Sequence, residues 1–239
     1  MPAGVIQAPP TPSREELAAL QAVVDDWSGM VSDHLGRGRA RRVTVGLYLD
    51  RRLPSTLDAH ILLPLRATHE ATTACLAHEV VHAVVGRSTH PLLNEGLAVH
   101  VDDRLRLGGP AWPFYDLPPD AWVRCMRRRG TLLRLSELEA LGGSPPVERI
   151  WAFYLEAGSF VGFLRDHLGD AELWRRFDSG VMADGWPDSL EARWLHTLDG
   201  QACGGEETAI ARMLATHAAW CAANGIAGPP SPFGPGGLA

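Results

Sequence analysis

The sequence has no apolar run of about 20 residues, which is the length that a membrane-spanning helix needs. Its first residues, MPAGVIQAPP, lack both the basic start and the apolar core of a signal peptide. An excess of basic residues is missing as well, because the formal net charge is −6 and arginine is spread along the chain. We therefore expect a cytoplasmic protein that binds neither nucleic acid nor a membrane.

Cysteine is scarce, and its spacing excludes a structural zinc site built from paired cysteines. No two of the cysteines form a C-x-x-C pair. Their even number permits disulfide bonds, but the spacing does not require any. The four positions are Cys75, Cys125, Cys203 and Cys221.

The length and the local patterns indicate one domain in two lobes. Residues 1–12 are rich in proline and are expected to be disordered, and residues 226–239 to form a flexible tail. Between them we expect a single domain at 13–225, with an N-terminal lobe at about 13–106 and a mainly helical C-terminal lobe at about 107–225. The predicted fold class is α+β, with a small mixed sheet packed on a helix of the N-terminal lobe.

A metal-binding pattern, His78-Glu79-Val80-Val81-His82, lies on a helix predicted from about residue 68 to residue 85. Residues i and i+4 of a helix share one face, so His78 and His82 can direct two imidazoles at one metal ion. Glu79 lies about 100° round the helix from His78. At that position its carboxylate can reach a water molecule bound to the metal rather than the metal itself. H-E-x-x-H on a helix is the signature of zinc hydrolases with this mechanism. The alternative interpretation is a buried helix whose histidines make ordinary hydrogen bonds.

Glu95 is the predicted third ligand. The residues between His82 and Glu95 leave room for the first helix to end, for a turn at His90-Pro91, and for a second helix to return a carboxylate. Two histidines and one glutamate leave one coordination position open, as catalytic zinc requires. We therefore expect one Zn²⁺ per chain. Other histidines near in sequence are expected to be structural or solvated, because three ligands are already supplied: His60, His69, His90 and His100.

With these residues the chain resembles the gluzincins, the thermolysin-like and aminopeptidase-like zinc peptidases, and in particular their compact peptidase MA-like branch. Three segments carry the resemblance, and Ser189–Trp194 adds weak support. Together they extend over roughly residues 43–200. The three segments are Leu76–His82, Pro91–Ala98, and Tyr154–Val161 with Phe163-Leu164.

The resemblance implies a zincin-like fold and a set of roles. His78, His82 and Glu95 would bind zinc, Glu79 would act as general base and then as proton donor, and Tyr154 would stabilise the oxyanion. By the residues alone, Tyr154 is also compatible with an ordinary core position, and His167 and His196 are rival donors.

The chain departs from the gluzincin pattern at two places. Thermolysin-like members have a carboxylate four residues after the glutamate ligand, where this chain has Val99. The task of orienting a metal-bound histidine would then fall to another group, with Asp102 and Asp103 as candidates. A glycine-rich exopeptidase motif upstream of the metal helix is also missing, so the resemblance does not extend to aminopeptidase specificity.

The function predicted from the sequence is zinc-dependent hydrolysis of a peptide or a small amide. A strand is predicted at 43–50 and another at 59–65, where Pro64 indicates either an edge strand or a strand end. An edge strand beside the metal helix would let an extended substrate pair with it. Two alternatives remain. One is a non-haem Fe(II) oxygenase that modifies peptides with the same triad. The other is a metal-bound interaction protein without turnover, which would not need Glu79.

Overall fold

A computed structural model describes residues 12–37, 42–48, 55–64, 69–107, 117–142, 149–179, 186–199, 208–213 and 215. These residues form many helices and one small mixed sheet, which confirms the expected α+β class. The chain divides into two compact units, Met1–Gly86 and Arg87–Ala239. Within the described part, no helix has the length and apolar character needed to cross a membrane.

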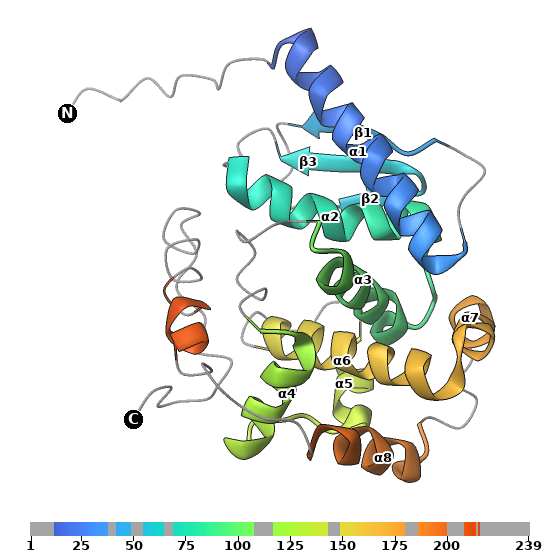
Figure 1. Ribbon diagram of the computed structural model, residues 1–239, viewed down its shortest axis with the longest axis vertical. Helices are drawn as coiled ribbons and strands as arrows, with labels where there is room; N and C mark the ends of the chain where they lie inside the picture. Colours follow the sequence, from blue (N-terminus) through green and yellow to red (C-terminus); the bar gives the residue numbers. More distant parts are fainter. Residues whose placement is uncertain are drawn as a thin grey trace. The chain divides into compact units, whose positions relative to one another are not determined.

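The first unit begins with α1 (Arg14–Leu35), drawn in blue in Figure 1. Ser13 starts this helix through a capping box: its hydroxyl accepts from the Glu16 N–H at 3.1 Å, and its own N–H donates to the Glu16 carboxylate at 2.7 Å. Gly36 ends the helix in the left-handed conformation, with φ of 57°. The buried face of α1 packs on α2 (His69–Val85) and on β1 (Thr44–Tyr48).

The sheet of this unit has the strand order β1-β3-β2, with β2 at Ser55–Leu57 and β3 at His60–Pro64. β1 and β3 are parallel, and β2 and β3 form an antiparallel hairpin. Of the two alternatives for Pro64, the edge strand is wrong because β3 is central, and the strand end is confirmed. Pro64 is its last residue, where a missing N–H removes little of the ladder. The strand that flanks β3 on its other side, β2, was not predicted.

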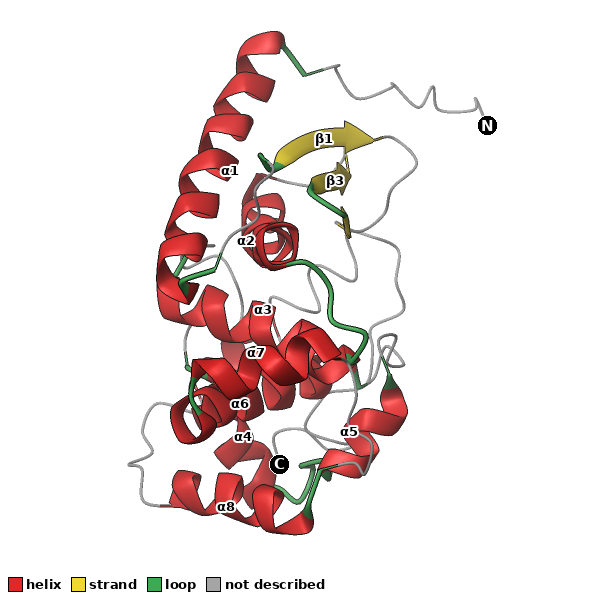
Figure 2. Cartoon of the chain, turned by 90° about the vertical axis from the view of Figure 1, so that its right-hand side faces the viewer, coloured by secondary structure: helices red, strands yellow, loops and turns green. Residues whose placement is uncertain are grey.

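α2 covers one face of this sheet, packing on β2 and β3. Figure 2 views α2 nearly end-on, with α1 on one side and the strands on the other. Leu76, Val80 and Val84 are almost fully buried, as their helical spacing predicts. The expected arrangement of a small mixed sheet on the helix that carries the His-Glu pattern is therefore present.

The second unit is helical, as expected for the C-terminal part of the chain. At its centre α3 packs against α6, and α6 also contacts α4, α5 and α7. The helical character expected for this part of the chain is confirmed for its described residues. The helices are α3 (Pro91–Leu105), α4 (Pro119–Arg128), α5 (Leu135–Leu141), α6 (Ile150–Leu168), α7 (Asp170–Ser179) and α8 (Asp188–Asp199), and residues 208–213 are also helical.

The boundary between the two units follows Gly86, whereas the sequence placed the lobe boundary near residue 106. The difference lies in α3, which packs with α6 and α5 and so belongs with the helices that follow it. Several expectations concern parts of the chain outside the described residues: the N-terminal tail up to residue 11, the tail at 226–239, and Cys203 and Cys221. Cys125 is buried with a free thiol.

Ser159 and Glu156 are among the polar residues buried inside the helical unit. Ser159 accepts a hydrogen bond from the Trp194 indole N–H at 3.0 Å and donates one to Asp120 at 2.6 Å, so it ties α6 to α8 and α4. Glu156 is 0% exposed, and its two carboxylate oxygens accept from the Leu133 N–H at 3.2 Å each. Burial raises the pKa of Glu156 well above its ordinary value, since the charged form loses its hydration.

We expect Glu156→Gln to change how stability depends on pH. The folded chain keeps the Glu156 proton to a higher pH than the unfolded chain, so unfolding releases a proton as the pH rises above 4.5. As the pH rises, the free energy of unfolding of the wild type should therefore fall relative to that of Glu156→Gln. Urea titrations at a series of pH values measure this difference. Glu15→Gln, at an exposed position of α1, is the control and should run parallel to wild type.

Candidate functional site

His78 and His82 lie one turn apart on α2, and their Nε2 atoms are 3.0 Å apart. Their rings stand nearly perpendicular, with an interplanar angle of 82°. His82 is buried at 5% exposure and His78 is half-buried, so the pair has limited access to water. The helix thus brings the two imidazoles together as the i, i+4 spacing predicts.

The separation of these nitrogens suits a tetrahedral metal ion. Two nitrogens that each lie about 2.0–2.1 Å from one zinc ion in tetrahedral geometry are about 3.3 Å apart. The observed 3.0 Å is close to this distance. A neutral imidazole pair can also share one N–H···N hydrogen bond at such a distance. The donor types and their spacing therefore fit a zinc ion.

Glu79, which follows His78 on α2, contacts the sheet. The Thr56 hydroxyl of β2 lies 2.6 Å from Oε2 of Glu79 and 3.0 Å from its backbone oxygen. Thr56 is 4% exposed, so its side chain has little freedom to rotate. The carboxylate of Glu79 is therefore held on the sheet side of α2 by a neutral donor.

Glu95 lies in the first part of α3, and its neighbours hold its carboxylate. The Asn94 side-chain amide donates to Oε1 of Glu95 at 2.8 Å. The same amide accepts the Ser88 N–H at 3.2 Å, which ties the segment before α3 to the helix. Asn94 is buried, so these bonds satisfy a polar group that would otherwise cost free energy.

In the part of the chain that the structure describes, one group of His, Cys, Asp and Glu side chains is close enough to hold a metal ion. It consists of His78, His82 and Glu95, which each offer one ligand atom, and these atoms all lie within 4.8 Å of one another. These are the three residues that the sequence predicts as metal ligands, and their role as ligands stays a prediction.

Close packing of α3 on α6 sets the surroundings of Glu95 in the helical unit. A Cβ added to Gly96 would lie 2.4 Å from the Ala157 backbone oxygen, and one added to Gly158 would lie 2.5 Å from a Val99 methyl group. Only glycine permits these approaches. Val99, which stands where thermolysin-like members have a carboxylate, is therefore a packing residue of this interface.

Tyr154 lies on α6, three residues before Ala157, and is half-buried. It is thus one helical turn from the point where α6 meets Gly96, the neighbour of Glu95. His167 lies about 15 Å further along α6 than Ala157, at 1.5 Å per residue. Its side chain is exposed, and its Nδ1 pairs with the Phe163 carbonyl at 3.0 Å. His196 is exposed on α8. Of the two residues on α6, Tyr154 is therefore the nearer along the helix to the contact with Gly96.

The remaining aspartate and histidine residues considered in the sequence analysis lie in different surroundings. Asp102 is buried on α3, and burial raises the pKa of its neighbour Asp103. His60 bonds to the Thr44 and Tyr48 hydroxyls at 2.7 and 2.8 Å on the sheet, in agreement with a structural role. His90 lies 3.4 Å from Glu139, and the His100 ring packs against Gly162. The side chain of His69 lies outside the described residues.

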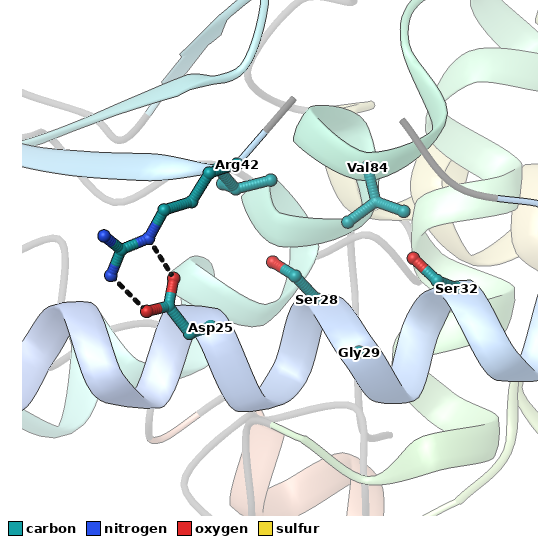
Figure 3. A pocket seen from close by; sticks show the side chains of 7 residues that line it. Asp25, Ser28, Gly29, Ser32, Arg42 and Val84 are labelled. Carbon is teal, nitrogen blue, oxygen red and sulfur yellow. Dashed lines mark hydrogen bonds and ion pairs between the residues drawn. The ribbon is translucent and has the colours of Figure 1, made fainter. Parts of the chain in front are cut away.

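A pocket of about 290 Å³ lies elsewhere in the first unit, beside α1 (Figure 3). Asp25 and Arg42 pair across its rim through two hydrogen bonds, and Ser28 and Ser32 line it. None of the predicted site residues lines this pocket. It is a small hollow apart from the histidine pair.

Sequence reasoning missed two residues that hold the site, Thr56 and Asn94. Asn94 could have been identified from the sequence, because it directly precedes Glu95. Thr56 carries none, because it lies 23 positions from Glu79 on a strand that was not predicted.

In comparisons with known proteins, no protein-family model, no curated protein and no solved structure matches the chain.

We expect Gly96→Ala to destabilise the protein by about 1–3 kcal/mol or more, because the new methyl group overlaps the Ala157 carbonyl. Chemical unfolding followed by circular dichroism measures the loss. Gly29→Ala is the matched control: it lies in α1 with nothing within 4 Å of the added Cβ, and it should stabilise the chain by about 0.5–1 kcal/mol. A Gly96→Ala variant as stable as wild type would contradict the close approach.

Proposed function

We propose that the protein is a zinc-dependent hydrolase of peptide or small amide bonds with a zincin-like, gluzincin-type site. The observation that carries the proposal is the convergence of His78, His82 and Glu95, with Glu79 on the same helix as the histidines. The sheet packed on α2 and the helical unit that follows are compatible with this fold. The resemblance of the sequence motifs to gluzincins supports the same conclusion.

Zinc bound by three protein ligands lowers the pKa of a coordinated water to about 7 and polarises a carbonyl group. The residues of the chain supply the remaining chemistry. Glu79 accepts a proton from the attacking water as its oxygen bonds to the carbonyl carbon. Glu79 then delivers this proton to the amine nitrogen as the carbon–nitrogen bond breaks, which returns the carboxylate to its starting state.

Tyr154 is the proposed donor to the oxyanion that forms during the attack. A neutral hydroxyl suits this role because it stabilises negative charge without competing for the metal. The place of Tyr154 on α6, one turn from the contact with Gly96, supports the choice.

Pairing of an extended substrate with the second predicted strand is excluded, because both sides of β3 are occupied by β1 and β2.

The Fe(II) oxygenase remains the second candidate, because the same three ligands form its facial triad. The carboxylate of Glu79 distinguishes the two functions. A hydrolase needs a base beside the metal, and the contact with buried Thr56 gives Glu79 a defined place. The presence of a carboxylate at position 79 favours hydrolysis, and it also argues against an interaction protein without turnover.

Metal analysis of protein purified without added metal should give about one zinc per chain. His82→Ala should lose most of this zinc, since it removes one of three ligands. Stoichiometric iron in the wild type would instead support the oxygenase, and absence of any metal from protein reloaded with zinc would refute the site.

Glu79→Gln should retain zinc and abolish hydrolysis, because the amide has no basic oxygen for the proton. Digestion of an unbiased peptide library with and without chelator, read by mass spectrometry, measures the activity. Glu15→Gln is the control for the change of a carboxylate to an amide and should cleave like wild type. Undiminished cleavage by Glu79→Gln would remove Glu79 from the mechanism.

Tyr154→Phe should lower kcat by about 10²–10³ with little loss of zinc, as expected when one oxyanion donor is removed. Tyr48→Phe, which removes a hydroxyl bonded to His60 in the sheet, is the control. Equal kcat values for the two variants would assign Tyr154 to the core.

A further inference from the structure

The contact between Thr56 and Glu79 joins a buried strand residue to the proposed base. β2 has an alternating burial pattern in which Thr56 is buried and Leu57 is exposed. The hairpin sets this alternation through the pairs Thr56↔Ile61 and Leu57↔His60. The turn residue Asp58 has φ of 56°, a left-handed conformation that aspartate tolerates. The hairpin thus aims the Thr56 hydroxyl at α2.

The hydroxyl has a single proton for two nearby acceptors. The carboxylate oxygen of Glu79 at 2.6 Å is closer than its backbone oxygen at 3.0 Å and carries the greater negative charge. The proton therefore goes mainly to Oε2. This leaves Oε1 as the oxygen of Glu79 that can accept a proton from water.

We propose that Thr56 is a positioning residue for the general base Glu79, an inference that rests on the proposed hydrolytic function. Glutamate has three rotatable side-chain bonds, and a base that samples several rotamers meets the attacking water for only part of the time. The buried Thr56 hydroxyl holds Oε2 and so selects one orientation of the carboxylate. Because this bond involves neither metal ligand nor substrate, its loss should affect the chemical step rather than zinc or substrate binding.

Three substitutions separate the hydroxyl from the packing. Thr56→Val replaces the hydroxyl by a methyl group of similar size, whereas Thr56→Ser keeps the hydroxyl and Thr56→Ala removes it. Thr44→Val is the matched control, because Thr44 is a strand threonine of the same sheet whose hydroxyl bonds to His60 instead. For each variant, kcat and KM on one peptide found in the library digest are measured beside the zinc content and the circular dichroism spectrum.

We expect Thr56→Val and Thr56→Ala to lower kcat about 10–100-fold, with KM and zinc content unchanged, in the range seen when a supporting hydrogen bond is removed. Thr56→Ser should recover most of kcat, and Thr44→Val should match wild type. If Thr56→Val does not fold, the comparison of Thr56→Ser with Thr56→Ala still tests the hydroxyl, since both of these variants lack the threonine methyl group.

Equal kcat for Thr56→Ser and Thr56→Ala would overturn the proposal, and so would a loss confined to zinc content or KM. Full activity of Thr56→Val beside an inactive Glu79→Gln would overturn the role of Thr56 and leave the hydrolytic function standing. Cleavage that Glu79→Gln does not diminish would overturn both.

Discussion

Two imidazole nitrogens that one turn of α2 holds 3.0 Å apart are the constraint on which the candidate site depends. A helix repeats every 3.6 residues, so residues four apart share a face whatever the rest of the chain does. α2 is in turn fixed by burial of its apolar side chains against the sheet and α1. The histidine pair is therefore presented by a rigid element, which suits a site that must keep its geometry when a metal binds.

Glu79 and Glu95, the two carboxylates with proposed functional roles, each accept a hydrogen bond from a neutral donor. Thr56 donates to Glu79, and Asn94 donates to Glu95. A neutral donor restrains a carboxylate without cancelling its charge, so Glu79 can still accept a proton and Glu95 can still bind a cation. A lysine or arginine in either place would compete with the metal for the carboxylate. This shared design agrees with one carboxylate acting as base and the other as ligand.

Much of the fold could be predicted because its signals are local. Ser13 and Glu16 begin α1 by a capping box, and apolar side chains at helical spacing predict α2 and α6. β2 escaped prediction because three residues are too few for an alternating pattern, and its strand character comes from pairing with β3. The central position of β3 was missed for the same reason. α3 was assigned to the first lobe because its packing on α6 depends on Gly96 and Gly158, whose partners lie about 60 residues away in the sequence.

The sequence by itself determined the residue types of the candidate ligands, the spacing of the two histidines on α2, and the proximity of Glu79 to His78, since these follow from the periodicity of one helix. Only the tertiary structure decided that Thr56 holds the carboxylate of Glu79 and that Gly96 of α3 packs against Ala157 of α6. Contacts of this kind depend on the register of a hairpin and on how closely two helices approach. Both are set by packing over the whole domain, which no local pattern records.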